Sequence, residues 1–214
     1  MVGSRFCEQT LHSLIKADLH GENSVDITDH ESISSFFNNF KFDIVILFSA
    51  FTDVDEAEKQ RDDRNEPCWQ INVEGAKNVA SEARQFSKKL ILISTNFVFD
   101  GQNGPYGEED SREGELSKIS WYGISKLKAE EEIEKITRDN LIIRITYPYR
   151  SKFEPKTDFA RSIIKRYDEN SLFPMFYDQT ITPTFIDDLA PSIDLLIKKE
   201  AKGIFHVASP VTTT

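Results

Sequence analysis

The sequence is poor in cysteine and lacks any long apolar run. No stretch approaches the roughly 20 apolar residues of a membrane-spanning helix, so we expect no membrane partner. The two cysteines, Cys7 and Cys68, lie far apart and make no disulfide or metal pattern. Arg5, Glu8 and His12 interrupt any apolar run near the N-terminus, which argues against a signal peptide. We therefore predict free thiols and a cytoplasmic location.

Dense basic segments and histidine clusters are also missing. The 214 residues include 26 Lys and Arg against 36 Asp and Glu, for a net charge of -10. A protein that binds the phosphate backbone needs a concentrated positive patch, so nucleic acid is not an expected partner. The four histidines are scattered singly, and we predict no metal site.

What the chain does contain is the alternation of an α/β protein. Short, nearly continuous apolar runs at 43–48, 90–94, 141–145 and 203–207 predict buried strands. Longer segments with helical apolar spacing lie at 67–86, 119–136 and 185–199, and Thr28 followed by Glu31 has the spacing of a capping box. Such alternation predicts a doubly wound parallel sheet, which binds ligands at the carboxyl ends of its strands.

The character of the chain changes after Tyr147. Six of the eight prolines follow it, and the apolar runs shorten. We predict one domain over residues 1–146 and a small lobe, interleaved with the last strands, over 147–214.

The strongest chemical signal is the pair Tyr122 and Lys126. Residues at i and i+4 lie on one face of a helix. A tyrosine has a pKa of about 10, and a nearby ammonium stabilises the phenolate and lowers that pKa. The pair can then exchange a proton with a carbonyl or alcohol while a cofactor moves the hydride. Alone this spacing is weak, since an aromatic residue packed beside a surface lysine gives the same pattern.

The context of the pair comes from Ser94 and Thr95, two hydroxyls at the end of a predicted strand about thirty residues upstream. A hydroxyl at that strand end can donate to the same substrate oxygen as the tyrosine. Capping of the strand end is the simpler alternative.

Together these motifs resemble the extended short-chain dehydrogenases and, within them, the dTDP-4-dehydrorhamnose reductase family. The resemblance covers nearly the whole chain in the expected order. It is carried by the segments 26–29 (DITD), 49–58 (SAFTDVDEAE), 72–75 (NVEG), 94–101 (STNFVFDG), 105–110 (PYGEED), 122–126 (YGISK) and 178–184 (DQTITPT).

The resemblance implies an oxidoreductase that uses NADPH or NADH on a nucleotide-linked 4-keto-6-deoxy sugar. Tyr122 would be the general acid, Lys126 its partner and a ribose ligand, and Thr95 a second donor to the keto oxygen. The implied cofactor-binding residues are Gly3, Asp26, Ile27, Ser49, Ala50, Phe51, Thr52, Asn72 and Lys126. The implied substrate-binding residues are Thr95, Asn96, Tyr147, Gln179 and Thr182. In the family the counterpart of Asn72 supports the catalytic lysine.

The residues after Thr95 narrow the reaction class. Sugar-nucleotide dehydratases of this superfamily place Asp-Glu there to eliminate water, whereas this chain has Asn96 and Phe97. This favours a reductase over a dehydratase. The reductase family usually has Asp-Tyr at these two positions and Trp where Tyr147 stands, so the identity of the sugar is open.

The glycine-rich dinucleotide fingerprint is represented only by its last part. The chain begins Met1-Val-Gly-Ser, with Gly3 in the place of the third glycine. The resemblance therefore predicts that residues 1–146 form an incomplete NAD(P)-binding domain, whose Rossmann-type sheet lacks its first strand, and that 147–214 form a substrate-binding lobe. The chain would then be either a fragment or a protein with altered cofactor binding. No residue near 17–25 distinguishes NAD from NADP.

Two other functions stay open. A regulatory branch of the family, the regulatory subunit of methionine adenosyltransferase, resembles the reductase but serves as a binding partner. A nucleotide-sugar epimerase would share the same fold. Because extended family members often dimerise, a homodimer is a further hypothesis.

Overall fold

The computed structural model describes residues 1–112, 114–153, 155 and 157–214, which form two compact units. The sheet unit comprises Leu14–Arg144 and Lys202–Phe205. The helical unit comprises Met1–Ser13, Ile145–Ala201 and His206–Thr214.

A four-stranded sheet forms the centre of the sheet unit. Its strands are β1 (Ile44–Leu47), β2 (Lys89–Thr95), β3 (Asn140–Ile145) and β4 (Gly203–His206), in the order β1-β2-β3-β4. β1 and β2 pair in parallel, with Ile44 opposite Lys89 and Leu47 opposite Leu92. β3 is buried throughout and β2 nearly so, whereas the edge strands β1 and β4 are only partly buried. The predicted parallel α/β fold is confirmed, with all four predicted strands in place.

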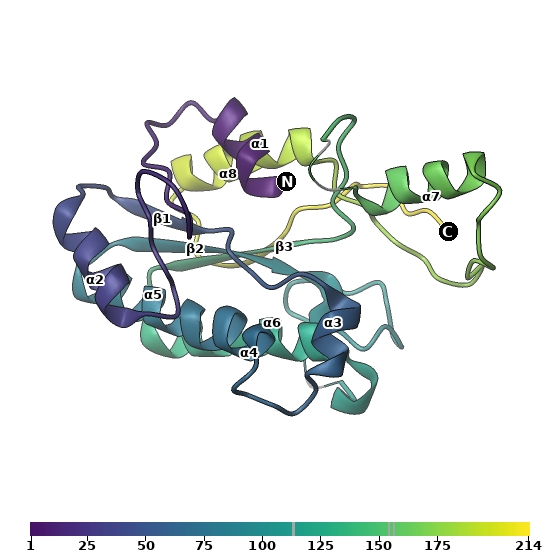
Figure 1. Cartoon of the computed structure of the whole chain (residues 1–214), viewed down its shortest axis with the longest axis horizontal. Coiled ribbons are helices and arrows are strands. Elements are labelled where there is room, and N and C mark those ends of the chain that lie inside the picture. The colour runs from purple at the N-terminus through teal and green to yellow at the C-terminus, as the bar shows by residue number, and fades with distance from the viewer. Residues whose placement is uncertain (113, 154, 156) are drawn as a thin grey trace. The chain divides into compact units, whose positions relative to one another are not determined.

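The helices of the sheet unit pack mainly on one face of the sheet (Figure 1). They are α2 (His30–Asn39), α3 (Val54–Lys59), α4 (Pro67–Trp69), α5 (Ala76–Gln85) and α6 (Trp121–Ile136), with the short 3-10 turns η2 (Asn96–Val98) and η3 (Leu116–Lys118). Figure 1 shows α4, α5 and α6 together below the strands. Small residues on α5 and α6 allow this approach, since Ala80, Ala83 and Ala129 are fully buried against Leu90 and Ile142.

The predicted helix at 67–86 is present but is interrupted. Between α4 and α5 the backbone takes a π-helical turn, η1 (Gln70–Gly75). Such turns are rare and often occur at functional sites. Gly75 closes this turn, and a Cβ there would come within 2.8 Å of the Ile27 side chain.

One predicted helix start is wrong. The cap of α2 is Asp29 and not Thr28. The Asp29 side chain accepts a hydrogen bond from the Glu31 amide. Thr28 instead donates its amide and its hydroxyl to Asp26.

The helical unit contains α1 (Val2–Gln9), α7 (Phe159–Asp168) and α8 (Ile186–Lys198). α1 packs on α8, and Arg5 binds both carboxylate oxygens of Asp187 at 2.7 Å. Thr10 donates to Asp194 at 2.8 Å. Residues 1–13 thus pack with the C-terminal part of the chain, so the compact units differ from the predicted division at 146/147.

None of the helices in the part of the chain that the structure describes is long and apolar enough to cross a bilayer.

Candidate active site

The end of β2 presents two buried hydroxyls. Ser94 and Thr95 are 3% and 7% exposed. The Thr95 hydroxyl accepts a hydrogen bond from the Phe97 amide at 3.2 Å, which opens the turn η2. It also bonds to the hydroxyl of Tyr122. The sequence predicts that Thr95 and Tyr122 lie close together, and in the structure they are in direct contact.

Helix α6 reaches this strand end because position 123 has no side chain. A Cβ on Gly123 would lie 2.1 Å from the Phe97 carbonyl oxygen and 2.7 Å from the Ile119 side chain. The Ser120 hydroxyl caps the helix by accepting from the Gly123 amide at 3.1 Å. Phe97 also contacts Tyr122 edge-on, with the ring centroids 5.9 Å apart. The first turn of α6 is therefore packed directly on η2.

The expectation of a lowered tyrosine pKa is wrong for this structure. Burial raises the pKa of Tyr122 to about 12, and the hydrogen bond from Thr95 opposes this rise only in part. Removal from water destabilises the phenolate form of Tyr122 more than the hydrogen bond from the Thr95 hydroxyl stabilises it. Tyr122 is therefore protonated at neutral pH, as a proton donor needs to be.

Lys126 is buried one turn along the same helix. Its side chain is 2% exposed, and its ammonium donates to the Ile93 carbonyl at 2.9 Å. Burial lowers its pKa to about 8, while the charge of Glu130 opposes that shift. A buried cation at a strand end, one helical turn from Tyr122, is costly, and such perturbed groups gather at functional sites.

Glu130 continues the same face of α6 and was missed by sequence reasoning. It is fully buried and accepts from Ser94 at 2.5 Å and from two nitrogens of Arg144 at 2.7 and 3.0 Å. Arg112, from the loop before α6, reaches Glu130 at 3.2 Å and Glu134 at 3.0 Å. The i+4 spacing from Lys126 is the available signal, but a charged run at the end of a helix is more often a solvated face.

Asn72 lies in the π-helical turn and joins two segments. Its side chain exchanges hydrogen bonds with the backbone of Phe51, at 2.8 Å to the amide and 3.1 Å to the carbonyl. It also donates to the Ser125 hydroxyl at 2.8 Å, which in turn donates to the Tyr122 carbonyl. Asn72 thus links Phe51 to Ser125, and it supports the lysine-bearing helix through Ser125.

The other predicted cofactor-binding residues fall into three places. Ser49, Ala50, Phe51 and Thr52 follow the carboxyl end of β1 and are partly or fully exposed. Asp26 and Ile27 lie before α2, where the Ile27 carbonyl accepts from Asn78 at 3.2 Å. Gly3 lies in the first turn of α1 in the helical unit.

The predicted substrate-binding residues divide between the units. Asn96 belongs to η2, and its side-chain oxygen is buried with no hydrogen-bond partner among the described residues. In the helical unit, Gln179 donates to the Tyr147 hydroxyl at 3.0 Å, so these two are brought together. Tyr147 has a positive φ of 38°, an uncommon backbone conformation for a bulky residue. Thr182 is partly buried beside the bridge between Ile181 and Thr213.

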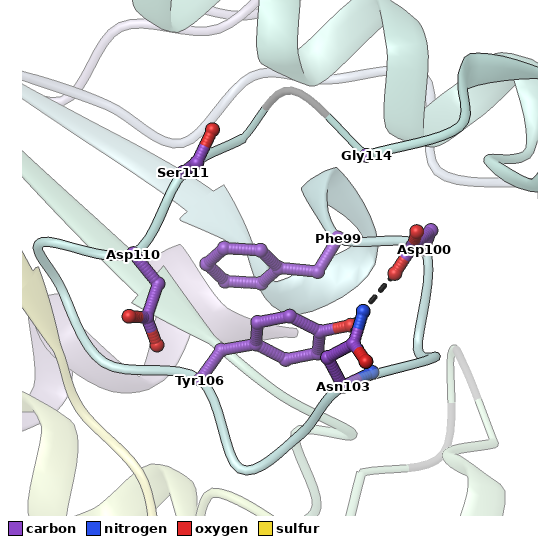
Figure 2. A pocket seen from close by; sticks show the side chains of 7 residues that line it. All are labelled: Phe99, Asp100, Asn103, Tyr106, Asp110, Ser111 and Gly114. Atoms are coloured by element: carbon purple, nitrogen blue, oxygen red, sulfur yellow. Dashed lines mark hydrogen bonds between the residues drawn. The ribbon is translucent and has the colours of Figure 1, made fainter.

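A pocket of about 310 Å³ lies within the loop that follows η2 (Figure 2). Figure 2 shows the rings of Phe99 and Tyr106 face to face, with centroids 4.3 Å apart. The Tyr106 hydroxyl donates to Asp100 at 2.7 Å. The lining residues are Phe99, Asp100, Asn103, Tyr106, Asp110, Ser111 and Gly114, with none of the predicted catalytic residues among them.

A family model described as the RmlD substrate binding domain matches residues 1–214. The spore coat polysaccharide biosynthesis protein SpsK of Bacillus subtilis is 30% identical over 209 residues, which are 97% of this chain and 70% of that protein. Methionine adenosyltransferase 2 subunit beta of Rattus norvegicus is 29% identical over 189 residues, which are 85% of this chain and 54% of that protein.

Among solved structures, the chain is similar to dTDP-4-dehydrorhamnose reductase of Bacillus anthracis in complex with NADP. The TM-score is 0.85 at 27% identity, and the match covers 100% of this chain and 72% of the other. Against the two curated relatives, the chain spans 54% to 70% of their length.

Replacing Gly123 by alanine should destabilise the fold. The new methyl group would overlap a backbone oxygen, which cannot move aside without shifting η2, and overpacking of this kind costs about 1–3 kcal/mol. Denaturant unfolding measures the change. Gly107→Ala is the matched control, because a Cβ there meets nothing nearer than Asp110 at 3.7 Å. Equal stability of the two variants would contradict the close approach.

Lys126→Met should change how stability depends on pH. Below about pH 8 the lysine is protonated in both states, and the folded chain bears the full cost of a buried ammonium. Between about 8 and 10.5 the folded state loses the proton while the unfolded state keeps it. The unfolding free energy of the native sequence should therefore rise relative to the variant, by up to ~3 kcal/mol.

Denaturant unfolding of both chains across this pH range checks the expectation. Lys128→Met is the control, since Lys128 lies on the same helix but pairs with Glu131 near the surface. A constant difference between the native chain and Lys126→Met would show that the lysine is not buried as a cation.

Proposed function

This chain belongs to the RmlD substrate-binding-domain family, and from that premise we propose that it reduces the C4 keto group of a nucleotide-linked 4-keto-6-deoxy sugar with NADPH or NADH. The single observation that carries the proposal is the hydrogen-bonded pair of Thr95 and a protonated Tyr122 beside the buried Lys126. Two hydroxyls that converge at one point can both donate to a single carbonyl oxygen.

The residues fit the reactive part of a nicotinamide dinucleotide. The backbone of Phe51 is fixed by Asn72 at the carboxyl end of a parallel strand, which is where such sheets bind nucleotides. Ser49, Ala50, Phe51 and Thr52 would border the cofactor, with Asp26 and Ile27 towards its adenine and Lys126 at the ribose. Gly3 of the helical unit is proposed as a cofactor-binding residue from the family resemblance alone. The dinucleotide, when bound, supplies the hydride.

In the proposed reaction Tyr122 donates its hydroxyl proton to the keto oxygen as that oxygen becomes an alcohol. Thr95 donates a hydrogen bond to the same oxygen and lowers the energy of the charge that develops there. Lys126 stabilises the tyrosinate that is left, and its own pKa near 8 allows it to pass on a proton. Atoms balance, because the ketone gains one hydride and one proton.

The proposed sugar contacts within the sheet unit are Thr95 and Asn96. Tyr147, Gln179 and Thr182 of the helical unit are proposed as substrate-binding residues from the family resemblance alone. Asn96 has the most specific support, since its buried oxygen lacks a partner among the described residues and a substrate hydroxyl would supply one.

A cytoplasmic reaction and a homodimer belong to the same proposal, and light scattering of the purified chain tests the dimer.

Similarity to methionine adenosyltransferase 2 subunit beta supports a second candidate, a binding subunit without turnover. In that case the chain would form a stoichiometric complex with a partner protein and would leave 4-keto sugars unchanged.

Tyr122→Phe should abolish most of the turnover. Removal of the proton donor costs about 10²- to 10⁴-fold in rate, while the fold is retained because the ring still packs on Phe97. The assay is oxidation of NADPH and of NADH with a dTDP-linked 4-keto-6-deoxy sugar. Retained turnover in this variant would refute the assignment. Cofactor binding without any turnover in the native chain would favour the binding subunit.

Asn96→Ala should lower kcat/KM for the sugar by about tenfold, because one hydrogen bond to a substrate hydroxyl is lost. Asn96→Asp keeps an acceptor oxygen and should retain more activity than the alanine variant. The same kinetic assay measures both. If the alanine variant matches the native chain, Asn96 does not contact the sugar.

A further inference from the structure

An ion pair outside the predicted site holds the backbone at the start of α6. Glu58, in α3, accepts a hydrogen bond from the Trp121 amide at 2.9 Å. Arg61, just beyond α3, donates to the Ile119 carbonyl at 2.8 Å. The two side chains also bind each other through both carboxylate oxygens. The pair therefore brackets residues 119–121, immediately before Tyr122.

The same pair is continuous with the segment that would border the cofactor. α3 begins directly after residues 49–53, and Asp53 caps it by accepting from the Glu56 amide. That segment is held to α6 a second time through Asn72, which bonds Phe51 on one side and Ser125 on the other. Tyr122 lies between these two attachment points, one at Trp121 and the other at Ser125.

Stability alone does not account for the ion pair. The side chains of Glu58 and Arg61 are 46% and 31% exposed, and ion pairs at such exposure contribute little to the free energy of folding. The cap of α6 is already supplied by Ser120. What the pair adds is orientation, since a bidentate carboxylate–guanidinium contact has a defined geometry.

We propose that Glu58 is a positioning residue, which together with Arg61 sets the place of the Tyr122 hydroxyl relative to residues 49–52. The inference deepens the proposed function and depends on it for its kinetic consequence. A misplacement of about 1 Å at a reacting group can cost about 100-fold in rate, so a contact with little effect on stability can have a large effect on turnover.

The two tryptophans of the chain provide a readout that is independent of activity. The chain contains only Trp69 and Trp121, and their rings stack with centroids 5.3 Å apart and an angle of 24° between planes. Stacked indoles give a coupled pair of bands in the far-ultraviolet circular dichroism spectrum. Because Glu58 holds the Trp121 backbone, this signal reports the geometry at the start of α6.

The experiment compares Glu58→Ala and Glu58→Gln with Glu56→Ala. Glutamine still accepts from the Trp121 amide but loses the charge pair, whereas alanine loses both. Glu56 lies on the same helix and pairs with Lys59, so its removal leaves the contact with α6 intact. We expect kcat to fall by about tenfold or more in Glu58→Ala, with a smaller loss in Glu58→Gln and none in Glu56→Ala. The tryptophan signal should weaken in the same order, with melting temperatures within about 4 °C of the native value.

If Glu58→Ala has the same kcat as the native chain, the proposal is overturned, whether or not the tryptophan signal changes. A loss of kcat in proportion to a large loss of melting temperature would also overturn it, because the role would then be structural only. If the native chain turns over no 4-keto sugar, the proposed function fails, whereas an unchanged tryptophan signal in Glu58→Ala refutes the positioning contact by itself.

Discussion

The close approach of α6 to the end of β2 is the constraint on which the candidate site depends. Three residues spaced by four on one face of the helix meet three consecutive residues of the strand. Tyr122 bonds Thr95, Lys126 bonds the Ile93 carbonyl, and Glu130 bonds Ser94. Gly123 makes this possible by leaving room for the Phe97 carbonyl. A larger residue there would overlap the Phe97 carbonyl oxygen and disturb this approach.

Burial of this contact between α6 and the end of β2 decides the chemistry of its side chains. It keeps Tyr122 protonated and lowers the pKa of Lys126 to about 8, so both groups carry their proton at neutral pH. The cost of burying Lys126 is limited by Glu130, whose charge is itself balanced by Arg144 and Arg112. Arg112 also binds Glu134, so two arginines, one lysine and two carboxylates form a single electrostatic system along α6.

The segment 49–53, which follows β1, is attached to the contact between α6 and β2 by side chains and not by sheet pairing. Asn72 reaches it from the π-helical turn, which rotates the following residues away from regular α-helical spacing. Glu58 and Arg61 reach the start of α6 from the other end of the segment. Both attachments join residues more than 50 positions apart in the chain, and both converge on the turn that carries Tyr122.

The sequence alone determined the strands, most of the helices and the pairing of a strand-end hydroxyl with Tyr122 and Lys126. These follow from local patterns: continuous apolar runs, the i+4 spacing on a helix, and the order of motifs that carries the family resemblance. Only the tertiary structure decided the raised pKa of Tyr122, the burial of Glu130 with Arg144, the grouping of α1 with α8 and the Glu58–Arg61 contact. Each of these depends on which distant segments exclude water from one another, and periodicity along a chain contains no information about that.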